Sequence, residues 1–210
     1  MLRADALKAD PLPPLSFAVR GGECLAIEGP SGVGKTRLLR ALADLDDARG
    51  HVFLDGAERR EMPATEWRRR VRYASAEPAW WTPTARGAFT PMGKSLPLPR
   101  DSEKLNRLLT AVGLTTASLD KPIADLSTGE RRRLALIRAL IDEPSVLLLD
   151  EPTIGLDAQS AALVEELVRF QVLSGRTVIF TSHDEDQIER LAHLRLQLAR
   201  PATVPRVQPA

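Results

Sequence analysis

The chain has 210 residues, of which 43% are hydrophobic and 27% charged, a composition typical of a soluble globular protein of one or two domains. Its 29 lysines and arginines nearly balance its 28 aspartates and glutamates, which argues against nucleic-acid binding through bulk positive charge. No apolar run approaches the roughly 20 residues of a membrane-spanning helix. Residues 1–14 lack the apolar segment of a signal peptide, and the single cysteine, Cys24, excludes an internal disulfide and agrees with a cytosolic location. We therefore expect no nucleic-acid partner and no direct membrane insertion.

The N-terminal part alternates between strand and helix patterns. Residues 24–28 are predicted to form a strand, a glycine-rich turn follows, and leucines at helical spacing from Leu38 to Leu45 predict a helix. Short strands are predicted at residues 51–54 and 71–74, before a proline-rich stretch begins.

The C-terminal part continues the alternation. In chain order we expect helices over residues 101–113 and 129–141, a buried strand over 145–149, a helix over 157–173, a strand over 177–181, a helix over 184–192 and a strand over 194–198. This order predicts an α/β fold. Its core comes from residues 1–76 and 142–198, a helical insertion spans 77–141, and residues 199–210 form a loose tail.

The turn after the first predicted strand reads Gly-Pro-Ser-Gly-Val-Gly-Lys-Thr, which matches the P-loop pattern. Glycines let successive backbone N–H groups point at one anion, and the following helix adds its positive end. An ordinary glycine turn is the alternative, but the predicted strand and helix on either side favour a phosphate site. The predicted nucleotide-binding residues are Gly29, Pro30, Ser31, Gly32, Val33, Gly34, Lys35 and Thr36. Thr36 is also a candidate Mg²⁺ ligand.

A continuous aliphatic strand ends in Asp150 and Glu151. Beside a P-loop, the first carboxylate is suited to hold Mg²⁺ and the second to polarise an attacking water. A buried strand with a solvated acidic end is the alternative interpretation, and the upstream P-loop argues against it.

The segment Leu126-Ser127-Thr128-Gly129-Glu130 begins a basic helix. A serine hydroxyl, a glycine and a helix N-terminus form an anion site, and an ordinary N-cap on Ser127 or Thr128 is compatible with that interpretation. The segment resembles the Leu-Ser-Gly-Gly-Gln signature of the ATP-binding cassette (ABC) family at three of its five positions. Thr128 replaces the first glycine of the signature, and Glu130 replaces the glutamine.

Two further motifs agree with this resemblance, which covers about residues 15–198. The residues Gly155-Leu156-Asp157 are similar to the loop through which the family's cassettes contact each other. His183 follows a β-branched strand, like the family's switch histidine. A lone histidine at a strand end is more often structural, so a hydrogen bond from its ring to the γ-phosphate is implied by the resemblance.

The resemblance implies a P-loop NTPase fold with a RecA-like core and an inserted helical subdomain, and ATP and Mg²⁺ as cofactors. Glu151 and His183 are then catalytic, and Thr36 and Asp150 bind the metal. In the family the nucleotide lies between two cassettes. A homodimer is therefore implied, with Ser127 and Gly129 binding the nucleotide of the other copy.

The function implied is the ATP-hydrolysing subunit of an ABC transporter, held on the cytoplasmic face of the inner membrane by a separate permease. The stretch Tyr-x-x-Ala-Glu-Pro-x-Trp-Trp is similar to small bacterial cassettes of iron or metal exporters, and haem-exporter and lipoprotein-releasing cassettes have similar lengths. An ABC ATPase acting on a cell-division or signalling partner is the alternative. A DNA-repair ATPase is disfavoured because the chain has neither heptads nor paired cysteines.

Beyond the signature segment, three further parts of the chain depart from the family pattern or stand out against it. Ala76 stands where the family places a glutamine, so either Glu77 or a water supplies that contact, or the chain does without it. Residues 5–12 contain no aromatic side chain to stack on adenine, which predicts weak purine selectivity. Trp80 and Trp81 are adjacent and cannot both face one side of an extended segment. Two interpretations are open: the tryptophans pack in the core, or at least one of them lines a groove that receives a helix of the permease.

Overall fold

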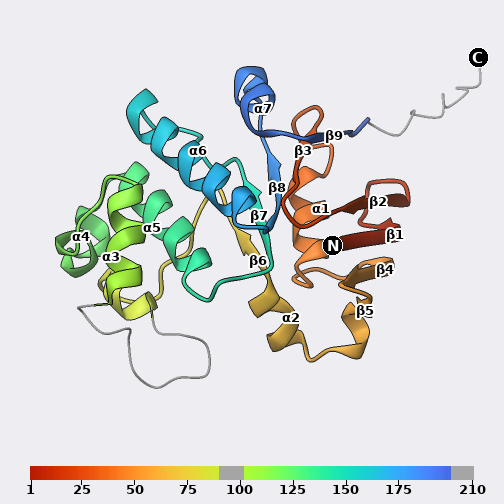
Figure 1. The fold of residues 1–210 in the computed structure, drawn as a ribbon, viewed down its shortest axis with the longest axis horizontal. Helices are drawn as coiled ribbons and strands as arrows, with labels where there is room; N and C mark the ends of the chain where they lie inside the picture. Colours follow the sequence, from red (N-terminus) through yellow and green to blue (C-terminus); the bar gives the residue numbers. More distant parts are fainter. Residues whose placement is uncertain (90–101, 200–210) are drawn as a thin grey trace, which may run out of the picture.

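The computed structural model describes residues 1–89 and 102–199, which form two sheets flanked by helices (Figure 1). The antiparallel sheet has the order β2-β1-β4-β5, built from β1 (Leu2–Lys8), β2 (Leu15–Val19), β4 (Arg49–Leu54) and β5 (Ala57–Glu58). The parallel sheet has the order β6-β7-β8-β3-β9, built from β3 (Cys24–Glu28), β6 (Val71–Ala74), β7 (Val146–Asp150), β8 (Thr177–Thr181) and β9 (Leu194–Gln197). The mixture of a parallel sheet with helices confirms the α/β class.

Seven α-helices and three short 3₁₀ segments complete the described part of the chain. The α-helices are α1 (Lys35–Leu42), α2 (Ala64–Arg70), α3 (Glu103–Ala111), α4 (Ala117–Asp120), α5 (Thr128–Leu140), α6 (Ala158–Leu173) and α7 (Glu185–Leu191). The 3₁₀ segments are η1 (Arg59–Glu61), η2 (Ala85–Phe89) and η3 (Ile123–Asp125). Figure 1 shows α3, α4 and α5 gathered at the end of the molecule opposite the antiparallel sheet.

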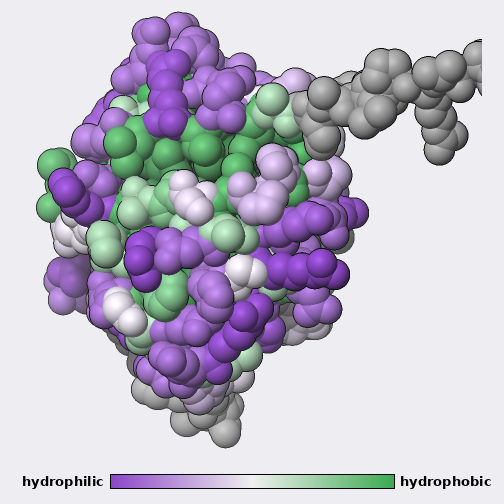
Figure 2. All heavy atoms as spheres, turned by 90° about the vertical axis from the view of Figure 1, so that its right-hand side faces the viewer, coloured by the Kyte–Doolittle hydropathy of each residue, from purple (hydrophilic) through white to green (hydrophobic). Residues whose placement is uncertain are grey.

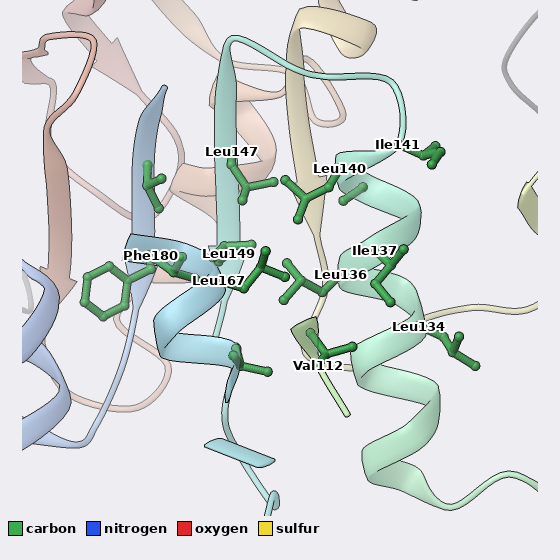
Figure 3. Close-up of a cluster of buried hydrophobic side chains, with 14 of the residues drawn as sticks. Val112, Leu134, Leu136, Ile137, Leu140, Ile141, Leu147, Leu149, Leu167 and Phe180 are labelled. Atoms are coloured by element: carbon green, nitrogen blue, oxygen red, sulfur yellow. The ribbon is translucent and has the colours of Figure 1, made fainter. Parts of the chain in front are cut away.

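The parallel sheet separates two hydrophobic cores because successive residues of a strand face opposite sides. In β7, Leu147 and Leu149 join the core formed with α5 and α6, whereas Val146 and Leu148 join the core formed with α1 and the antiparallel sheet. Figure 3 shows Leu140 of α5 facing the β7 leucines. Both faces of the strand are buried, which explains its continuous aliphatic sequence.

Three predicted strands coincide with β3, β6 and β8, and the other predicted elements differ mainly at their ends. The helix predicted as far as Leu45 ends at Leu42. Two residues later Asp44 adopts a left-handed conformation, with a φ of 59°, which a helix cannot continue through. In the antiparallel sheet only β4 was predicted, as a strand over residues 51–54, and its other strands and α2 were not predicted. In β1 the buried alternation is interrupted, because the register with β2 and β4 shifts around Ala6, whose φ is 46°. Residues 90–101 and 200–210, which include most of the predicted tail, lie outside the described residues.

Figure 2 views the face that carries the antiparallel sheet and the edge strand β9. Hydrophobic residues gather there in a band below the hydrophilic residues at the height of α7. Across residues 1–89 and 102–199, no helix combines the length and apolar character needed to cross a membrane.

Candidate nucleotide-binding site

The P-loop connects β3 to α1 and leaves the N-terminus of α1 open. Gly34 is the N-cap, with a φ of 116° that an L side chain rarely adopts, and within the described chain no side chain caps α1. The first backbone N–H groups of the helix are therefore available to an anion. Lys35 donates from Nζ to the carbonyl oxygen of Gly29 at 2.8 Å and of Pro30 at 3.4 Å, so its ammonium group lies inside the loop.

Asp150 ends β7 and accepts hydrogen bonds from three hydroxyl groups. Oδ2 accepts from Thr36 Oγ1 at 2.8 Å and from the Tyr73 hydroxyl at 3.0 Å, and Oδ1 accepts from Thr181 Oγ1 at 2.8 Å. The C-terminal parts of β6, β7 and β8 and the start of α1 meet here, because parallel strands end at the same edge of a sheet. The predicted pair of metal ligands, Thr36 and Asp150, is thus brought together.

Glu151 follows with a φ of 48°, a left-handed conformation that is strained for a non-glycine residue. Its backbone N–H donates to Thr181 Oγ1 at 3.0 Å. Its carboxylate oxygen Oε1 lies 3.0 Å from His183 Nε2, and this ring nitrogen lies 3.2 Å from Lys35 Nζ. The two predicted catalytic residues are therefore in contact with each other, and His183 also contacts the P-loop lysine.

These side chains line one open cavity of about 360 Å³. Its lining residues are Pro11, Ser31, Gly32, Gly34, Lys35, Thr36, Arg37, Asp150, Glu151 and His183. The volume lies within the range of small-molecule sites. Burial lowers the pKa of Lys35, while the negative charges of Glu151 and Asp150 raise it. Burial, and then the charge of Asp150, raises the pKa of Tyr73 to about 12, so Tyr73 remains a neutral donor.

The predicted signature segment lies apart from this cavity. Ser127 is the N-cap of α5: its Oγ accepts from Glu130 N at 3.1 Å, and Glu130 Oε2 accepts from Ser127 N at 2.8 Å. Hydrogen bonds with Ser127 hold the pKa of Glu130 below its ordinary value. Among the described residues that line the P-loop cavity, neither Ser127 nor Gly129 occurs. The chain folds this segment as a capped helix, with Ser127 of the two candidate residues as the N-cap and with Glu130 completing a capping box.

The segment around Ala76 lies beside the carboxylates. A small cavity of about 20 Å³, close to the space of one water, is lined by Ala76, Arg132 and Glu151 among others. Arg132 donates to the carbonyl oxygens of Ala76, at 2.9 Å, and of Ile154. Glu77 is exposed and is not among the described lining residues.

The two tryptophans differ in burial. Trp80 is half-buried against the core of α5 and α6, whereas Trp81 is 68% exposed. The Arg138 guanidinium lies 4.6 Å from both ring centroids and donates to the carbonyl oxygen of Ala79 at 3.2 Å. Burial, and then the charge of Arg72, lowers the pKa of Arg138 to about 10.

The N-terminal segment that approaches the P-loop carries no aromatic residue, as expected, and its apolar side chains divide between two places. Leu7 and Leu12 are buried in the core, at 0% and 1% exposed. Pro11 instead lines the cavity, and Arg37 donates to the carbonyl oxygen of Asp10 at 3.0 Å. Pro11 is thus the apolar residue of this segment that faces the site.

Sequence reasoning missed four residues of this site, namely Tyr73, Thr181, Pro11 and Arg37. Tyr73 and Thr181 contact Asp150 across 77 and 31 positions of sequence, and no local motif marks such contacts. A polar or hydroxyl-bearing residue at the end of an otherwise apolar strand was the available signal for Thr181.

The fold and the cavity define a P-loop nucleotide-binding protein. A family model described as ABC transporter matches residues 12–154. The chain belongs to the ABC transporter family, as an ATP-binding cassette, which confirms the predicted family and fold.

Curated relatives agree with this assignment. Protein STAR1 of Oryza sativa subsp. japonica is 37% identical over 198 residues, covering 91% of this chain and 56% of the relative. Nod factor export ATP-binding protein I of Ralstonia nicotianae is 36% identical over 187 residues, covering 84% and 56%. The chain thus spans little more than half the length of these relatives.

Solved structures share the fold. An ATP-binding subunit of an ABC transporter has a TM-score of 0.83 at 23% identity, covering 94% of this chain and 85% of that one. A dimeric cassette bound to ADP and phosphate has a TM-score of 0.79 at 21% identity, covering 94% of both chains. A bacterial Atm1-family exporter with ATP bound has a TM-score of 0.78 at 25% identity, covering 96% of this chain and 38% of that one.

Proposed function

We propose that this chain binds and hydrolyses ATP to power an ABC transporter whose membrane subunit is a separate chain. The observation that carries the proposal is the convergence of Lys35, Thr36, Asp150, Glu151 and His183 on one open cavity. Residues 77–141 then form the helical subdomain, and residues 1–76 and 142–198 form the core.

The residues of the cavity fit ATP and Mg²⁺. The open N-terminus of α1 and the ammonium group of Lys35 suit phosphate oxygens. Ser31 and Gly32 also line the cavity. Gly29, Pro30 and Val33 shape the loop, since the carbonyl oxygens of the first two accept from Lys35 Nζ and the Val33 N–H donates to the Pro30 carbonyl. Thr36 and Asp150 offer hard oxygen ligands, with Oγ1 and Oδ2 2.8 Å apart. A bound Mg²⁺ would neutralise charge on the phosphate oxygens.

Glu151 and His183 have the arrangement needed for water activation. Glu151 is only partly exposed and can accept a proton from a water beside the phosphates. His183 Nε2, 3.0 Å from Glu151 Oε1 and 3.2 Å from Lys35 Nζ, lies where it can orient that carboxylate or bind a phosphate oxygen.

A second copy of the chain would complete the site. Ser127 and Gly129 lie outside the cavity of their own chain, so the proposed contact of these residues with nucleotide requires a partner cassette. One of the structural neighbours is a dimeric cassette bound to ADP and phosphate, which supports this arrangement.

The test is Glu151→Gln, measured with ATP and Mg²⁺ by size-exclusion chromatography with light scattering and by phosphate release. We expect turnover to fall at least about 100-fold, because the general base is lost, and an ATP-bound dimer to accumulate. Glu66→Gln, which changes an exposed carboxylate of α2, is the control and should behave as the wild type. A Glu151→Gln chain that stays monomeric with ATP would contradict the proposal.

The permease would contact the exposed Trp81. The Arg138 guanidinium contacts the rings of both Trp81 and Trp80 and holds the Trp81 side chain in place. Contact with the permease would hold the chain at the cytoplasmic face of the inner membrane. Trp81→Ala should break transport while sparing basal ATPase activity. Loss of folding or of basal turnover in this variant would contradict a role of Trp81 in permease contact, and so would unchanged transport.

The cargo and direction are proposed from similarity alone. The names of the Ralstonia relative and of the Atm1-family neighbour specify export, which supports an exporter. A metal such as iron remains the hypothesis drawn from the sequence around Ala76-Glu77. An ABC ATPase acting on a cell-division or signalling membrane partner is the alternative. Co-purification of a permease with several membrane spans would favour the transporter.

Base selectivity and the Ala76 position each allow a direct test. Pro11 offers an apolar surface without an aromatic ring, so we expect ATP to be preferred over GTP by less than about tenfold. Parallel ATPase and GTPase assays measure this ratio.

If Glu77 supplies the contact that Ala76 lacks, Glu77→Ala should change the metal dependence of turnover; unchanged dependence would exclude that role.

A further inference from the structure

Thr181 ends β8, and its hydroxyl makes two hydrogen bonds to the residues that end β7. Oγ1 donates to Asp150 Oδ1 at 2.8 Å and accepts the backbone N–H of Glu151 at 3.0 Å. The residue is 0% exposed, so water does not compete for these bonds. We propose that Thr181 is a positioning residue whose single hydroxyl sets both the carboxylate of Asp150 and the backbone of Glu151. The inference rests on the roles proposed above for these two acids.

The first consequence concerns Asp150. A carboxylate can rotate and present either oxygen, but Oδ1 is engaged by Thr181. Oδ2 is then the oxygen that faces Thr36 Oγ1, at 2.8 Å. Thr181 therefore fixes the orientation of the carboxylate plane, so that one oxygen is held beside the other candidate metal ligand.

The second consequence concerns Glu151. Its φ of 48° lies in the left-handed region, which is strained for an L residue. The hydrogen bond from its N–H to Thr181 Oγ1 compensates for part of that strain, because a buried N–H must find a partner. This conformation sets Oε1 3.0 Å from Nε2 of His183, which lies two residues beyond Thr181. One strand end thus aligns both proposed catalytic side chains.

A purely structural role is the competing explanation, and the same strand supplies a control for it. Thr177 begins β8, is 2% exposed, and donates from Oγ1 to the carbonyl oxygen of Arg20 at 3.0 Å. Thr177→Val and Thr181→Val each replace a buried, hydrogen-bonded hydroxyl by a methyl group on one strand. Only Thr181 contacts the acids, so the two explanations predict different kinetics.

The experiment uses the full chain and measures kcat and KM for ATP, the affinity for a fluorescent ATP analogue with and without Mg²⁺, and the thermal midpoint. For Thr181→Val we expect kcat to fall about 30-fold or more, in the range seen when a positioned polar group is lost. Its affinity without Mg²⁺ should stay within about twofold, and most of the gain on adding Mg²⁺ should disappear. Both Thr181→Val and Thr177→Val should lower the thermal midpoint, and by similar amounts, but Thr177→Val should leave kcat within about twofold of the wild-type value.

Further variants test whether the hydroxyl restores kcat and which results would contradict the positioning role of Thr181. Thr181→Ser keeps the hydroxyl and should retain kcat within about threefold. If Thr181→Val does not fold, Thr181→Ala carries the same prediction at smaller volume. Normal kcat and normal Mg²⁺ dependence in a folded Thr181→Val or Thr181→Ala chain, or an equal kcat loss in Thr177→Val, would overturn the inference. Full turnover by Glu151→Gln would instead contradict the proposed role of Glu151.

Discussion

The N-termini of α1 and α5 both carry an anion-binding pattern, yet a side chain caps the backbone N–H donors only at α5 in the described chain. At α1, Gly34 is the N-cap and within the described chain no side chain caps the helix. At α5, Ser127 and Glu130 cap each other with bonds of 3.1 and 2.8 Å. The comparison indicates that one site is preformed in the single chain. The other is held as a capped helix end, which would have to share its donors with the phosphate that we propose it binds in trans.

Removing the cation from the open end should give the largest effect. We expect Lys35→Ala to weaken ATP binding at least about 100-fold, because the buried ammonium group that would make a charge-assisted hydrogen bond to phosphate is lost. Lys104→Ala is the control, since Lys104 Nζ also donates to a backbone carbonyl, that of Ile141 at 2.7 Å, but lies on α3. Isothermal titration with ATP measures both. Binding by Lys35→Ala at wild-type strength would mean that the phosphates bind elsewhere.

Filling the open end with a side chain tests its geometry. An added Cβ at Gly34 meets Leu12 Cγ at 3.1 Å and requires a φ of 116°. We expect Gly34→Ala to lose roughly tenfold or more in ATP affinity, since strain of about 1–3 kcal/mol moves the first N–H groups. Gly175→Ala also demands a positive φ, of 86°, but meets no atom within 4 Å, so it should lower stability alone. Equal affinity in the two variants would show that the loop tolerates a side chain.

The contrast between these two ends also shows what sequence can reveal. A P-loop is local: Gly34 and Lys35 follow β3 directly, and a strand, a turn and a helix suffice to predict the site. The capping box of α5 is local in the same way. Contacts that tertiary packing creates were not predictable, such as those of Tyr73 and Thr181 with Asp150. The strand β1 of the antiparallel sheet was missed for a related reason, because its register with β2 and β4 is irregular and hides its alternation.

Removing the serine cap separates its two proposed uses. Ser127→Ala should cost about 1 kcal/mol of unfolding free energy, the usual effect of losing an N-cap. Ser102→Ala is matched, since Ser102 caps α3 with a bond of 3.4 Å to Leu105 N. Denaturant unfolding should rank the two variants as similar. ATP-dependent dimerisation of the Glu151→Gln chain should weaken only when Ser127→Ala is added; equal dimerisation would confine Ser127 to capping.

Changing the charge at the capped end should give the smallest effect. Glu130 carries a carboxylate whose pKa is held below its ordinary value by hydrogen bonds with Ser127, so it is charged at neutral pH beside the proposed trans phosphate site. Its remaining oxygen, Oε1, lies 3.3 Å from Lys121 Nζ, which offsets part of that charge. Glu130→Gln keeps a side chain that can accept the Ser127 N–H but removes the repulsion between carboxylate and phosphate. We therefore expect ATP-dependent dimerisation of the Glu151→Gln chain to tighten about two- to fivefold, with an effect that shrinks as salt screens the charges.

The salt dependence makes this prediction specific. Sedimentation velocity at low and high ionic strength gives the dimerisation constant of Glu151→Gln with and without Glu130→Gln. Lys121→Gln removes the positive charge that offsets Glu130, so it should weaken dimerisation where Glu130→Gln strengthens it. If both changes act in the same direction, the capped end of α5 influences dimerisation through the stability of its helix cap. If they act in opposite directions, phosphate binding at α5 is limited by the charge of the residue that caps it.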